Sequence, residues 1–537
     1  MALASVYVRA CLLLFVSFQV TVALPKAPLL LQGPFRIREP LTIAPSEFDQ
    51  VEGPPSVAQR IAIIGSGITG ASAAFTLAEN ARQNSRAIVP LITIFEQNPI
   101  IGGRITTTQV YDEPELTIDT CAATFDTLSD TCIGGLARDV GLMATSVQLR
   151  DNGTAVWNGS SFVGFVEDAG FRDYNTWSPF KQARFGLRYG RSAAASGQSG
   201  IETNYRILGT AVFKSLSNEL ELRNLNDTVL KAACETKSNF CQRDAGGDRW
   251  RREVIEAGVR DRFFGDADEL NELNSALGLA SETGLSSVNG GNLRLVDRLI
   301  KLSGAQLLLG SKVSAIELDD EEQWVLTTAV SGALKGIPFD KVIIAAPLSL
   351  ANISVTPEIT APLIDFTDTV VTHFTSKQGI CAERFNSTLP VPQTILSSAT
   401  ATEAGNKAEL PFFSFRLLDD NILPTNRTVS TPGENLYKIV SSNELSDAEI
   451  TSYLEPKEPI DKDPVITWIN RELLPNSVPR LNRALKLQDD VEVVKNLFYA
   501  GGGAQVTDTI EFNCRLGRNA ARLIVPNKVR GQPGNGL

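Results

Sequence analysis

The chain has 537 residues, of which 43% are hydrophobic and 21% are charged, so it can bury a sizeable core and is not a largely disordered protein. Lys and Arg number 50 and Asp and Glu 61, and the resulting net charge of −11 disfavours binding to nucleic acid or to an anionic membrane. The single histidine, His373, excludes a His-rich metal site and a His-Glu-x-x-His protease helix. Difficult chemistry would therefore fall to a bound cofactor.

Residues 1–23 have the pattern of a secretory signal peptide. An arginine precedes an apolar stretch that is too short to span a membrane, and Thr21 and Ala23 are the small residues expected before a cleavage point. We expect entry into the secretory pathway, ending in the lumen of a lysosome or vacuole or outside the cell; a buried N-terminal helix or a membrane anchor is the alternative. Residues 24–57 are rich in proline and predict a linker.

Six cysteines follow the signal segment, and an even number in an oxidising compartment permits disulfides. Cys234 and Cys241 flank a short polar loop and are the predicted local pair, with separate buried thiols as the alternative. Asparagines in Asn-x-Ser/Thr sequons are candidate glycosylation sites at the surface. They are Asn152, Asn158, Asn226, Asn352, Asn386 and Asn426.

The first ordered segment has the pattern of a βαβ unit. Residues 61–64 are a short apolar run typical of a strand buried on both faces, and a glycine-rich turn leads from them into a helical run over 71–81. A second apolar run, 91–95, ends at Glu96. Strand, glycine turn, helix and strand in this order open a parallel sheet.

Later segments have the patterns of further elements of the same sheet. They are the loop-to-helix run 290–302, the strand-like runs 306–309, 313–318, 324–330, 342–346 and 497–500, and the helical run 509–524. A hairpin through residues 319–322 is predicted to join the runs 313–318 and 324–330. The predicted dinucleotide-binding domain is therefore discontinuous, with residues 58–149, 285–350 and 490–527. The intervening segments 150–284 and 351–489 are predicted to form a second, substrate-binding domain.

The glycine turn has the Gly-x-Gly-x-x-Gly spacing of a dinucleotide site. Gly65 makes the tight turn, Gly67 lets the backbone approach a pyrophosphate, and Gly70 permits close contact between helix and strand. The N-terminus of the helix offers N–H groups to the phosphates. Glu96 can accept hydrogen bonds from both ribose hydroxyls and disfavours the 2′-phosphate of NADP. A glycine-rich turn without a ligand is the alternative.

Residues 99–104 extend this site with two more glycines and Arg104, a cation that can neutralise pyrophosphate charge. The extension resembles the Glu-x-x-x-x-x-Gly-Gly-Arg segment of flavoproteins with two dinucleotide-binding motifs, the amine-oxidase-like (GR2) group. The C-terminal strand, glycines and helix are similar to the segment that closes over the flavin in that group. The resemblance implies FAD as the cofactor. The residues expected to bind it are Gly65, Ser66, Gly67, Ile68, Thr69, Gly70, Glu96, Gln97, Gly102, Gly103, Arg104, Val313, Gly502, Gly503 and Glu511.

Scattered blocks over residues 60–525 resemble the prenylcysteine oxidase (prenylcysteine lyase) family. They are the stretches 287–292, 303–305 and Val313, the strand 371–376, and the terminal helix with Thr509-Ile510-Glu511 and 519–523. The sequence departs from the family pattern at Asp119-Thr120-Cys121, which lacks the expected glycine and serine, and over residues 150–284. The resemblance implies an α/β fold, a Rossmann-type FAD-binding domain interleaved with an α+β substrate domain.

The same resemblance implies an FAD-dependent oxidase that uses oxygen to cleave a prenylated cysteine into cysteine, a prenyl aldehyde and hydrogen peroxide. Such chemistry needs positioning and an apolar channel more than a strong base. His373 is the one catalytic candidate, with a structural role as the alternative, and Cys514 is either a flavin attachment point or a disulfide or buried thiol. Four phenylalanines are candidates either for a prenyl channel or for the core: Phe374, Phe412, Phe413 and Phe415.

Two other functions stay open. The first is a secreted flavin amine oxidase of different specificity. The second is a non-enzymatic escort protein that binds prenyl groups on the same fold, against which the glycine motif and the signal peptide argue. The expected partners are a small-molecule substrate and oxygen, without nucleic acid and without a transmembrane segment, and the sequence sets no oligomeric state.

Overall fold

A computed structural model describes most of the chain beyond residue 57. The described residues are 58–83, 90–121, 123–126, 132–146, 153–166, 179–190, 223, 253, 256–266, 270, 285–330, 333–361, 363–388, 390–398, 400–401, 407–408, 410–422, 433–456, 464–480, 490–505 and 507–526. Several sequence predictions lie outside them: the signal segment and linker, the Cys234–Cys241 pair, and the sequons at Asn152, Asn226 and Asn426.

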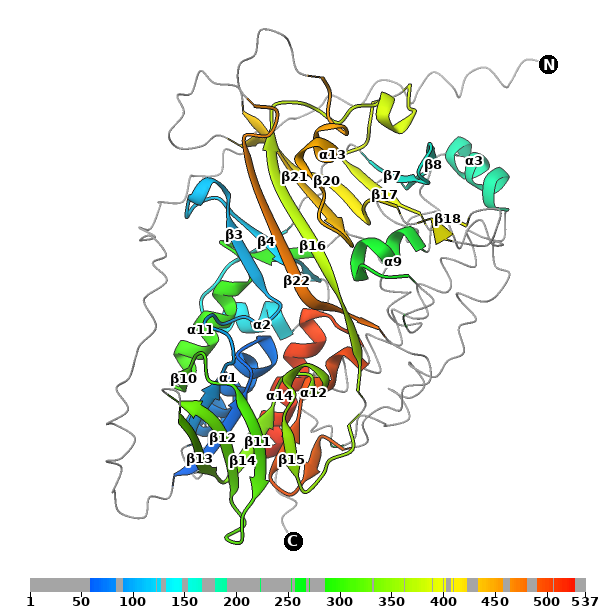
Figure 1. Ribbon diagram of the computed structural model, residues 1–537. Coiled ribbons are helices and arrows are strands. Elements are labelled where there is room, and N and C mark those ends of the chain that lie inside the picture. Colours follow the sequence, from blue (N-terminus) through cyan, green and yellow to red (C-terminus); the bar gives the residue numbers. More distant parts are fainter. Residues whose placement is uncertain are drawn as a thin grey trace, which may run out of the picture. The chain divides into compact units, whose positions relative to one another are not determined.

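A six-stranded sheet carries the dinucleotide motif (Figure 1). Its strands lie in the order β10 (Gln306–Leu308), β2 (Pro90–Phe95), β1 (Gln59–Ile64), β14 (Lys341–Ile344), β24 (Leu497–Tyr499) and β23 (Glu492–Val494). Neighbouring strands are parallel except β24 and β23. The predicted βαβ unit is confirmed: helix α1 (Ile68–Gln83) connects β1 to the parallel strand β2.

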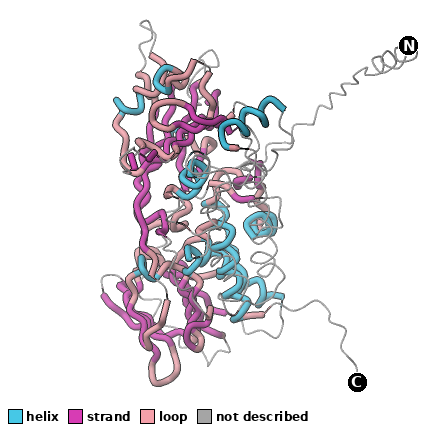
Figure 2. The backbone as a smooth tube through the Cα atoms, turned by 90° about the vertical axis from the view of Figure 1, so that its right-hand side faces the viewer, coloured by secondary structure: helices cyan, strands magenta, loops and turns pink. Residues whose placement is uncertain are grey.

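Both faces of this sheet are buried. Ile61, Ile63 and Ile94 pack on the face that is covered by helices, whereas Ile64 and Val342 pack on the opposite face. The covering helices are α1, α11 (Leu293–Ser303) and α14 (Ile510–Ile524). In the lower part of Figure 2, helices lie to one side of the strands. Burial on both faces explains why the strands are continuous apolar runs without polar alternation.

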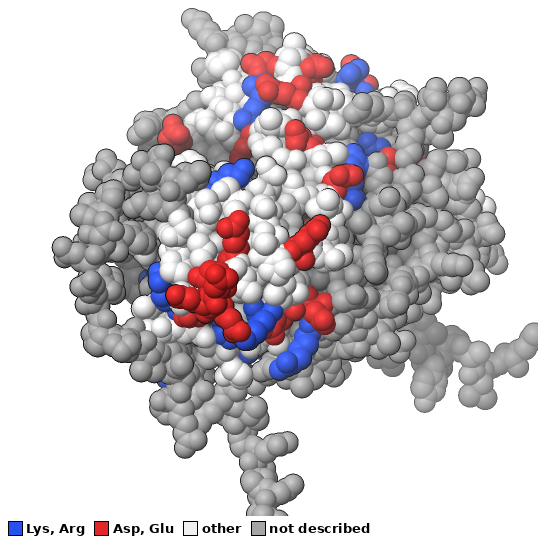
Figure 3. Space-filling view, turned by 60° about the horizontal axis from the view of Figure 1, so that its bottom comes forward, with Lys and Arg blue, Asp and Glu red and all other residues white. Residues whose placement is uncertain are grey.

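A four-stranded sheet covers the second face. Its strands lie in the order β13 (Ala333–Phe339), β12 (Trp324–Val330), β11 (Val313–Leu318) and β15 (Ser354–Thr356). The predicted hairpin between β11 and β12 is confirmed, and the Asp319 carboxylate closes it by accepting backbone hydrogen bonds from Glu321 and Gln323. An exposed ion pair joins Glu322 to Lys495 at 2.7 Å. The face drawn in Figure 3 carries acidic and basic side chains together among the described residues.

A seven-stranded, mostly antiparallel sheet forms the second large layer. Its strands lie in the order β22 (Trp468–Arg480), β16 (Asp365–Ser376), β21 (Glu434–Ser441), β20 (Ser414–Ile422), β17 (Thr394–Ser397), β7 (Thr154–Trp157) and β8 (Phe162–Val166). The long strands β16 and β22 run side by side through the middle of Figure 1. Helix α9 (Glu256–Phe263) packs on β17.

Short elements complete the described fold. They are β3 (Thr106–Gln109), η2 (Val110–Asp112), β4 (Thr117–Cys121), β5 (Phe125–Asp126), α2 (Cys132–Asp139), β6 (Ala144–Ser146), α3 (Pro179–Tyr189), β9 (Leu285–Val288), α12 (Leu348–Ala351), η7 (Glu383–Phe385), β18 (Thr400–Ala401), β19 (Lys407–Ala408), α13 (Asp447–Thr451) and η8 (Gly501–Gln505). The predicted α/β fold class is confirmed, because a parallel sheet with helices on one face is joined to a second, sheet-rich part.

Candidate functional site

A cavity of about 1360 Å³ lies between the dinucleotide turn and the seven-stranded sheet. Gly65, Gly67 and Glu96 belong to one part of its wall, and Arg416 and Lys438 belong to another. Single small-molecule sites span roughly 300–1,000 Å³. The cavity therefore has room for a dinucleotide and a second molecule together.

Most of the predicted cofactor residues line this cavity. Those in its wall are Gly65, Gly67, Ile68, Thr69, Glu96, Gln97, Gly102, Gly103, Arg104, Val313 and Glu511. The other four, Ser66, Gly70, Gly502 and Gly503, do not line it, and Gly501 lines it instead of its two neighbours. The predicted cofactor residues thus locate one continuous site, and the four that do not line the cavity lie beside it in the chain.

The glycines of the turn have different structural roles. A Cβ at Gly70 would lie 2.0 Å from the Gly65 carbonyl oxygen, so this glycine allows the close approach of helix to strand that its position in the motif predicts. A Cβ at Gly67 would meet no atom nearer than the Gly102 oxygen at 3.6 Å. The space in front of Gly67 is therefore open toward the cavity, and the N-terminus of α1, which has no acidic residue in its first turn, adjoins it. This arrangement fits a pyrophosphate.

Glu96 is held at the end of β2 with its carboxylate almost fully buried. Its Oε2 accepts hydrogen bonds from the backbone N–H of Ser66 at 2.9 Å and from the Ser66 hydroxyl at 2.7 Å, and Oε1 accepts one from Asn98 N–H at 2.9 Å. A carboxylate oxygen has two acceptor positions, so Oε1 keeps one for a ribose hydroxyl. Ser66 thus orients Glu96, a role that sequence reasoning did not identify.

Arg104 is paired with Asp508, which also lines the cavity. Both guanidinium ends donate to the Asp508 carboxylate, one of them at 2.8 Å. Burial lowers the pKa of Arg104, but the Asp508 charge and hydrogen bond outweigh burial, and the pKa is raised. The charge of Arg104, which the sequence predicted to neutralise pyrophosphate, is therefore already balanced by the carboxylate of Asp508, 404 residues later in the chain.

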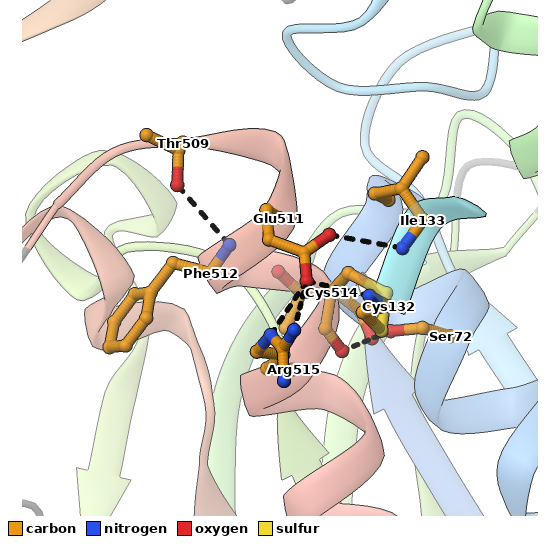
Figure 4. Close-up of a disulfide and its surroundings, with 9 residues drawn as sticks. Ser72, Cys132, Ile133, Thr509, Glu511, Phe512, Cys514 and Arg515 are labelled. Atoms are coloured by element: carbon orange, nitrogen blue, oxygen red, sulfur yellow. Dashed lines mark hydrogen bonds and ion pairs between the residues drawn. A yellow bond between two sulfur atoms is a disulfide. The ribbon is translucent and has the colours of Figure 1, made fainter. Parts of the chain in front are cut away.

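Glu511 lies beside a disulfide between Cys132 and Cys514 (Figure 4). Its carboxylate accepts hydrogen bonds from the backbone N–H groups of Cys132 at 2.6 Å and Ile133 at 3.1 Å and from Arg515 at 2.6 Å. The carboxylate caps the N-terminus of α2, where the helix dipole favours negative charge. Because Cys514 is disulfide-bonded, flavin attachment at this residue is wrong and the disulfide interpretation is confirmed.

A row of polar residues crosses the seven-stranded sheet from strand to strand. Asn470 pairs with His373, His373 with Lys438, and Lys438 with Arg416. Directly paired residues project from the same face, so the row shares the face on which Lys438 and Arg416 line the cavity. The Arg416 guanidinium pairs with Asp261 of α9, with Nε 3.3 Å from Oδ1.

Lys438 contacts the stretch at which the sequence departs from the family pattern. Its Nζ donates to the Thr120 carbonyl at 2.9 Å, and burial lowers its pKa. Asp119 accepts hydrogen bonds from Thr107 Oγ1 at 2.6 Å and from Asn292 N–H at 3.0 Å, yet burial raises its pKa to about 6. Asp119, Thr120 and Cys121 all line the cavity.

His373 lies in the polar row but not in the cavity wall. Its side chain is fully buried, and neither ring nitrogen has a hydrogen-bond partner among the described residues. Burial and the nearby Lys438 charge hold the pKa of the imidazole well below its usual value, so the ring is neutral. This placement favours the structural alternative over a catalytic role.

The four candidate phenylalanines belong to the core and do not line the cavity. Phe374, Phe412 and Phe415 pack with Tyr437 and other rings on the far face of the seven-stranded sheet, and Phe413 joins a smaller cluster. The channel interpretation is therefore wrong, and the core interpretation is confirmed. Apolar side chains in the cavity wall beside the polar row come instead from other positions: Phe263, Phe264, Leu418, Val440 and Leu474.

Three sequons lie among the described residues. Asn352 and Asn386 are exposed at turns, and the Asn158 side chain accepts hydrogen bonds from the backbone of Ser160 and Ser161. Within the described residues, no helix is both long enough and apolar enough to cross a membrane.

Family models match two parts of the chain. The model described as prenylcysteine lyase matches residues 202–532, and that of an NAD(P)-binding Rossmann-like domain matches residues 63–155. None of the curated proteins compared with the chain matches it in sequence.

Solved structures of two oxidases share the fold. A double mutant of putrescine oxidase is 13% identical with a TM-score of 0.51, and the match covers 88% of this chain and 100% of that one. Cyclohexylamine oxidase from Brevibacterium oxydans IH-35A is 16% identical with a TM-score of 0.52, covering 87% and 98%. At these identities the likeness concerns the fold alone. Since the prenylcysteine lyase model covers more than half of the chain, including the polar row and the disulfide-bonded Cys514, the chain belongs to the prenylcysteine lyase family.

Proposed function

We propose that the chain is an FAD-dependent oxidase that cleaves the thioether of a prenylated cysteine. The observation that carries this proposal is a single cavity in which a dinucleotide turn and an apolar wall meet, in a member of the prenylcysteine lyase family. In the overall reaction one allylic C–H bond and the adjacent C–S bond break, water supplies the aldehyde oxygen, and oxygen takes up two electrons and two protons. Cysteine, a prenyl aldehyde and hydrogen peroxide are the products.

The residues of the first wall fit FAD. Gly67 and the N-terminus of α1 would hold the pyrophosphate, Glu96 the ribose, and Gly102 and Gly103 a second backbone approach. Bound FAD supplies the acceptor for the hydride of the allylic carbon. The Arg104–Asp508 pair adds no net charge, so this part of the wall stays close to neutral.

The residues of the second wall suit an apolar substrate. Phe263, Phe264 and Leu474 offer apolar surface that can bind the prenyl chain and exclude water from the reacting carbon. Holding the thioether in one orientation is the main contribution that such a wall can make to the rate.

The working compartment is part of the proposal. The Cys132–Cys514 disulfide requires an oxidising environment, and the exposed sequons at Asn352 and Asn386 are accessible to glycosylation. Together with the signal-like segment 1–23, these features support a protein of the secretory pathway, in a lysosome or vacuole lumen or outside the cell.

Peroxide release tests the reaction. Purified protein should be yellow with absorbance near ~450 nm, as expected of bound flavin, and should release peroxide and free cysteine from farnesylcysteine but not from spermine or a simple amine. Activity on amines alone would move the function to an amine oxidase, which the shared fold with putrescine oxidase keeps as the second candidate. A colourless, folded protein would favour an escort without FAD.

The variant Gly67→Asp tests the cofactor site. The new Cβ has room, so the fold should persist, whereas the carboxylate enters the space for the pyrophosphate and should lower flavin content at least about tenfold by repulsion. Gly135→Asp is the matched control, because Gly135 of α2 lies outside the cavity wall and a Cβ there meets no atom within 4 Å. Equal flavin content in both variants would contradict the assignment.

A further inference from the structure

Lys438 is a partly buried cation in the cavity wall, and not all of its donors are used. Its ammonium makes one hydrogen bond to the described residues, to the Thr120 carbonyl at 2.9 Å, and no ion pair with any of them. The neighbouring cation Arg416 is paired with Asp261. An ammonium has three donors, so two of those on Lys438 remain for an anion in the cavity.

A carboxylate lies close to this ammonium on the opposite element. Asp119 of β4 precedes Thr120, the residue to which Lys438 donates, and the two charges interact electrostatically. Asp119 Oδ1 accepts hydrogen bonds from the Thr107 hydroxyl and from the Asn292 N–H. Its Oδ2 accepts only the longer contact with the same Asn292 N–H, at 3.2 Å. Asp119 therefore has acceptor capacity for a cation in the cavity.

Apolar surface begins directly beside the two charges. Val440, two residues from Lys438 on β21, packs in one cluster with Leu474, Cys121 and Phe264, and all four line the cavity. A cation and an anion directly beside apolar surface match a molecule with a zwitterionic head and an apolar tail.

We propose that Lys438 and Asp119 bind the charged head of the substrate, the α-carboxylate at Lys438 and the α-ammonium at Asp119. The identity of the tail rests on the proposed function. The pair makes the free amino acid the preferred substrate, because a peptide-linked or esterified cysteine lacks one or both charges. Holding the head at this point also fixes how far the thioether reaches along the cavity.

Binding of a probe that is not turned over tests the proposal. S-octylcysteine has the zwitterionic head but no allylic C–H bond, so its affinity for the FAD-loaded protein is measurable by calorimetry without reaction. The wild-type protein should bind it about tenfold to a hundredfold more tightly than its methyl ester or its N-acetyl derivative, the range expected for one charge-assisted hydrogen bond.

Variants assign the two ends of the head. Lys438→Met should abolish the preference over the methyl ester, Lys438→Arg should keep most of it, and Asp119→Asn should abolish the preference over the N-acetyl derivative. Lys495→Met is the matched control, since Lys495 is an exposed lysine outside the cavity wall. Circular dichroism confirms that each variant is folded.

Two results overturn the proposal: equal affinity of the wild-type protein for the acid and the ester, or an unchanged preference for the acid in Lys438→Met. The proposed function fails separately. If S-octylcysteine is bound with the expected preference and farnesylcysteine yields no peroxide, the head site stands and the reaction does not. If farnesylcysteine yields peroxide but S-octylcysteine is bound no more tightly than its methyl ester, the reaction stands and the head site does not.

Discussion

The two faces of the seven-stranded sheet have opposite chemistry although the same strands build both. Phe374 and Tyr437 stack on one face with ring centroids 5.0 Å apart. Their immediate chain neighbours, His373 and Lys438, form the polar row on the other face together with Arg416. Alternation along a strand separates the two sets, because successive side chains point to opposite faces.

Burial acts on the two faces in different ways. On the aromatic face it stabilises the fold through apolar contact. On the cavity face it acts on groups that titrate below or near neutral pH or carry charge: it lowers the pKa of His373 and Lys438 and raises that of Asp119 on the facing strand β4. Charges kept in a wall at the expense of stability are typical of a binding site, so the comparison assigns stability to one face and recognition to the other.

The largest expected effect concerns the aromatic face. Phe415 is fully buried, and its ring centroid lies 5.6 Å from that of Tyr437. Phe415→Ala should lower the free energy of unfolding by about 3–5 kcal/mol through lost contacts and a cavity. Urea unfolding measures the loss, with Phe415→Leu as a milder control. The folded variant should still bind S-octylcysteine more tightly than its methyl ester. Loss of this preference would contradict the assignment of stability to one face and recognition to the other.

Asp119 gives a smaller effect that depends on pH. Its pKa of about 6 in the folded protein lies above the usual 3.8, so protonation favours the folded state and the carboxylate destabilises it increasingly as pH rises from about 4 to above 6. Asp119→Asn removes this penalty. The variant should be more stable than the wild-type protein by about 3 kcal/mol at pH 7.5, and the difference should shrink to about 0.5 kcal/mol near pH 4.

Urea unfolding from pH 4 to 8, without ligand, measures the Asp119 difference. A constant difference across this range would mean that the carboxylate is not destabilised by burial. Saturating S-octylcysteine should reduce the difference at pH 7.5, because its ammonium compensates the Asp119 charge only in the wild-type protein.

Local patterns in the sequence predict the dinucleotide half of the molecule well. The βαβ unit, the glycine turn and the hairpin at residues 319–322 each depend on neighbours within a few residues, and the structure contains all three. Glu96 is positioned by the same local logic, because it ends the strand next to the turn.

The remaining parts of the site depend on partners far apart in the chain. Arg104 meets Asp508, and Cys132 meets Cys514, across separations of 404 and 382 residues that no local pattern encodes. The sequence around His373 predicts a strand, but it does not predict which face of that strand meets the cavity. Phe374 was therefore a candidate for the channel, whereas in the structure its neighbour His373 lies on the cavity face and Phe374 lies in the core on the other face. Lys438 had no sequence signal at all, since its role depends on the register of three strands.

His373 gives the smallest expected effect and locates the edge of the recognition face. The ring is buried, neutral and without a hydrogen-bond partner among the described residues, so a leucine of similar size removes unsatisfied polar atoms without leaving a large cavity. His373→Leu should change the free energy of unfolding by less than about 1 kcal/mol, in the stabilising direction, and leave kcat for farnesylcysteine within about twofold (0.4 kcal/mol). A tenfold loss of kcat at unchanged stability would mean that His373 takes part in the reaction. The residues that act on the substrate would then extend from β21 to the neighbouring strand β16.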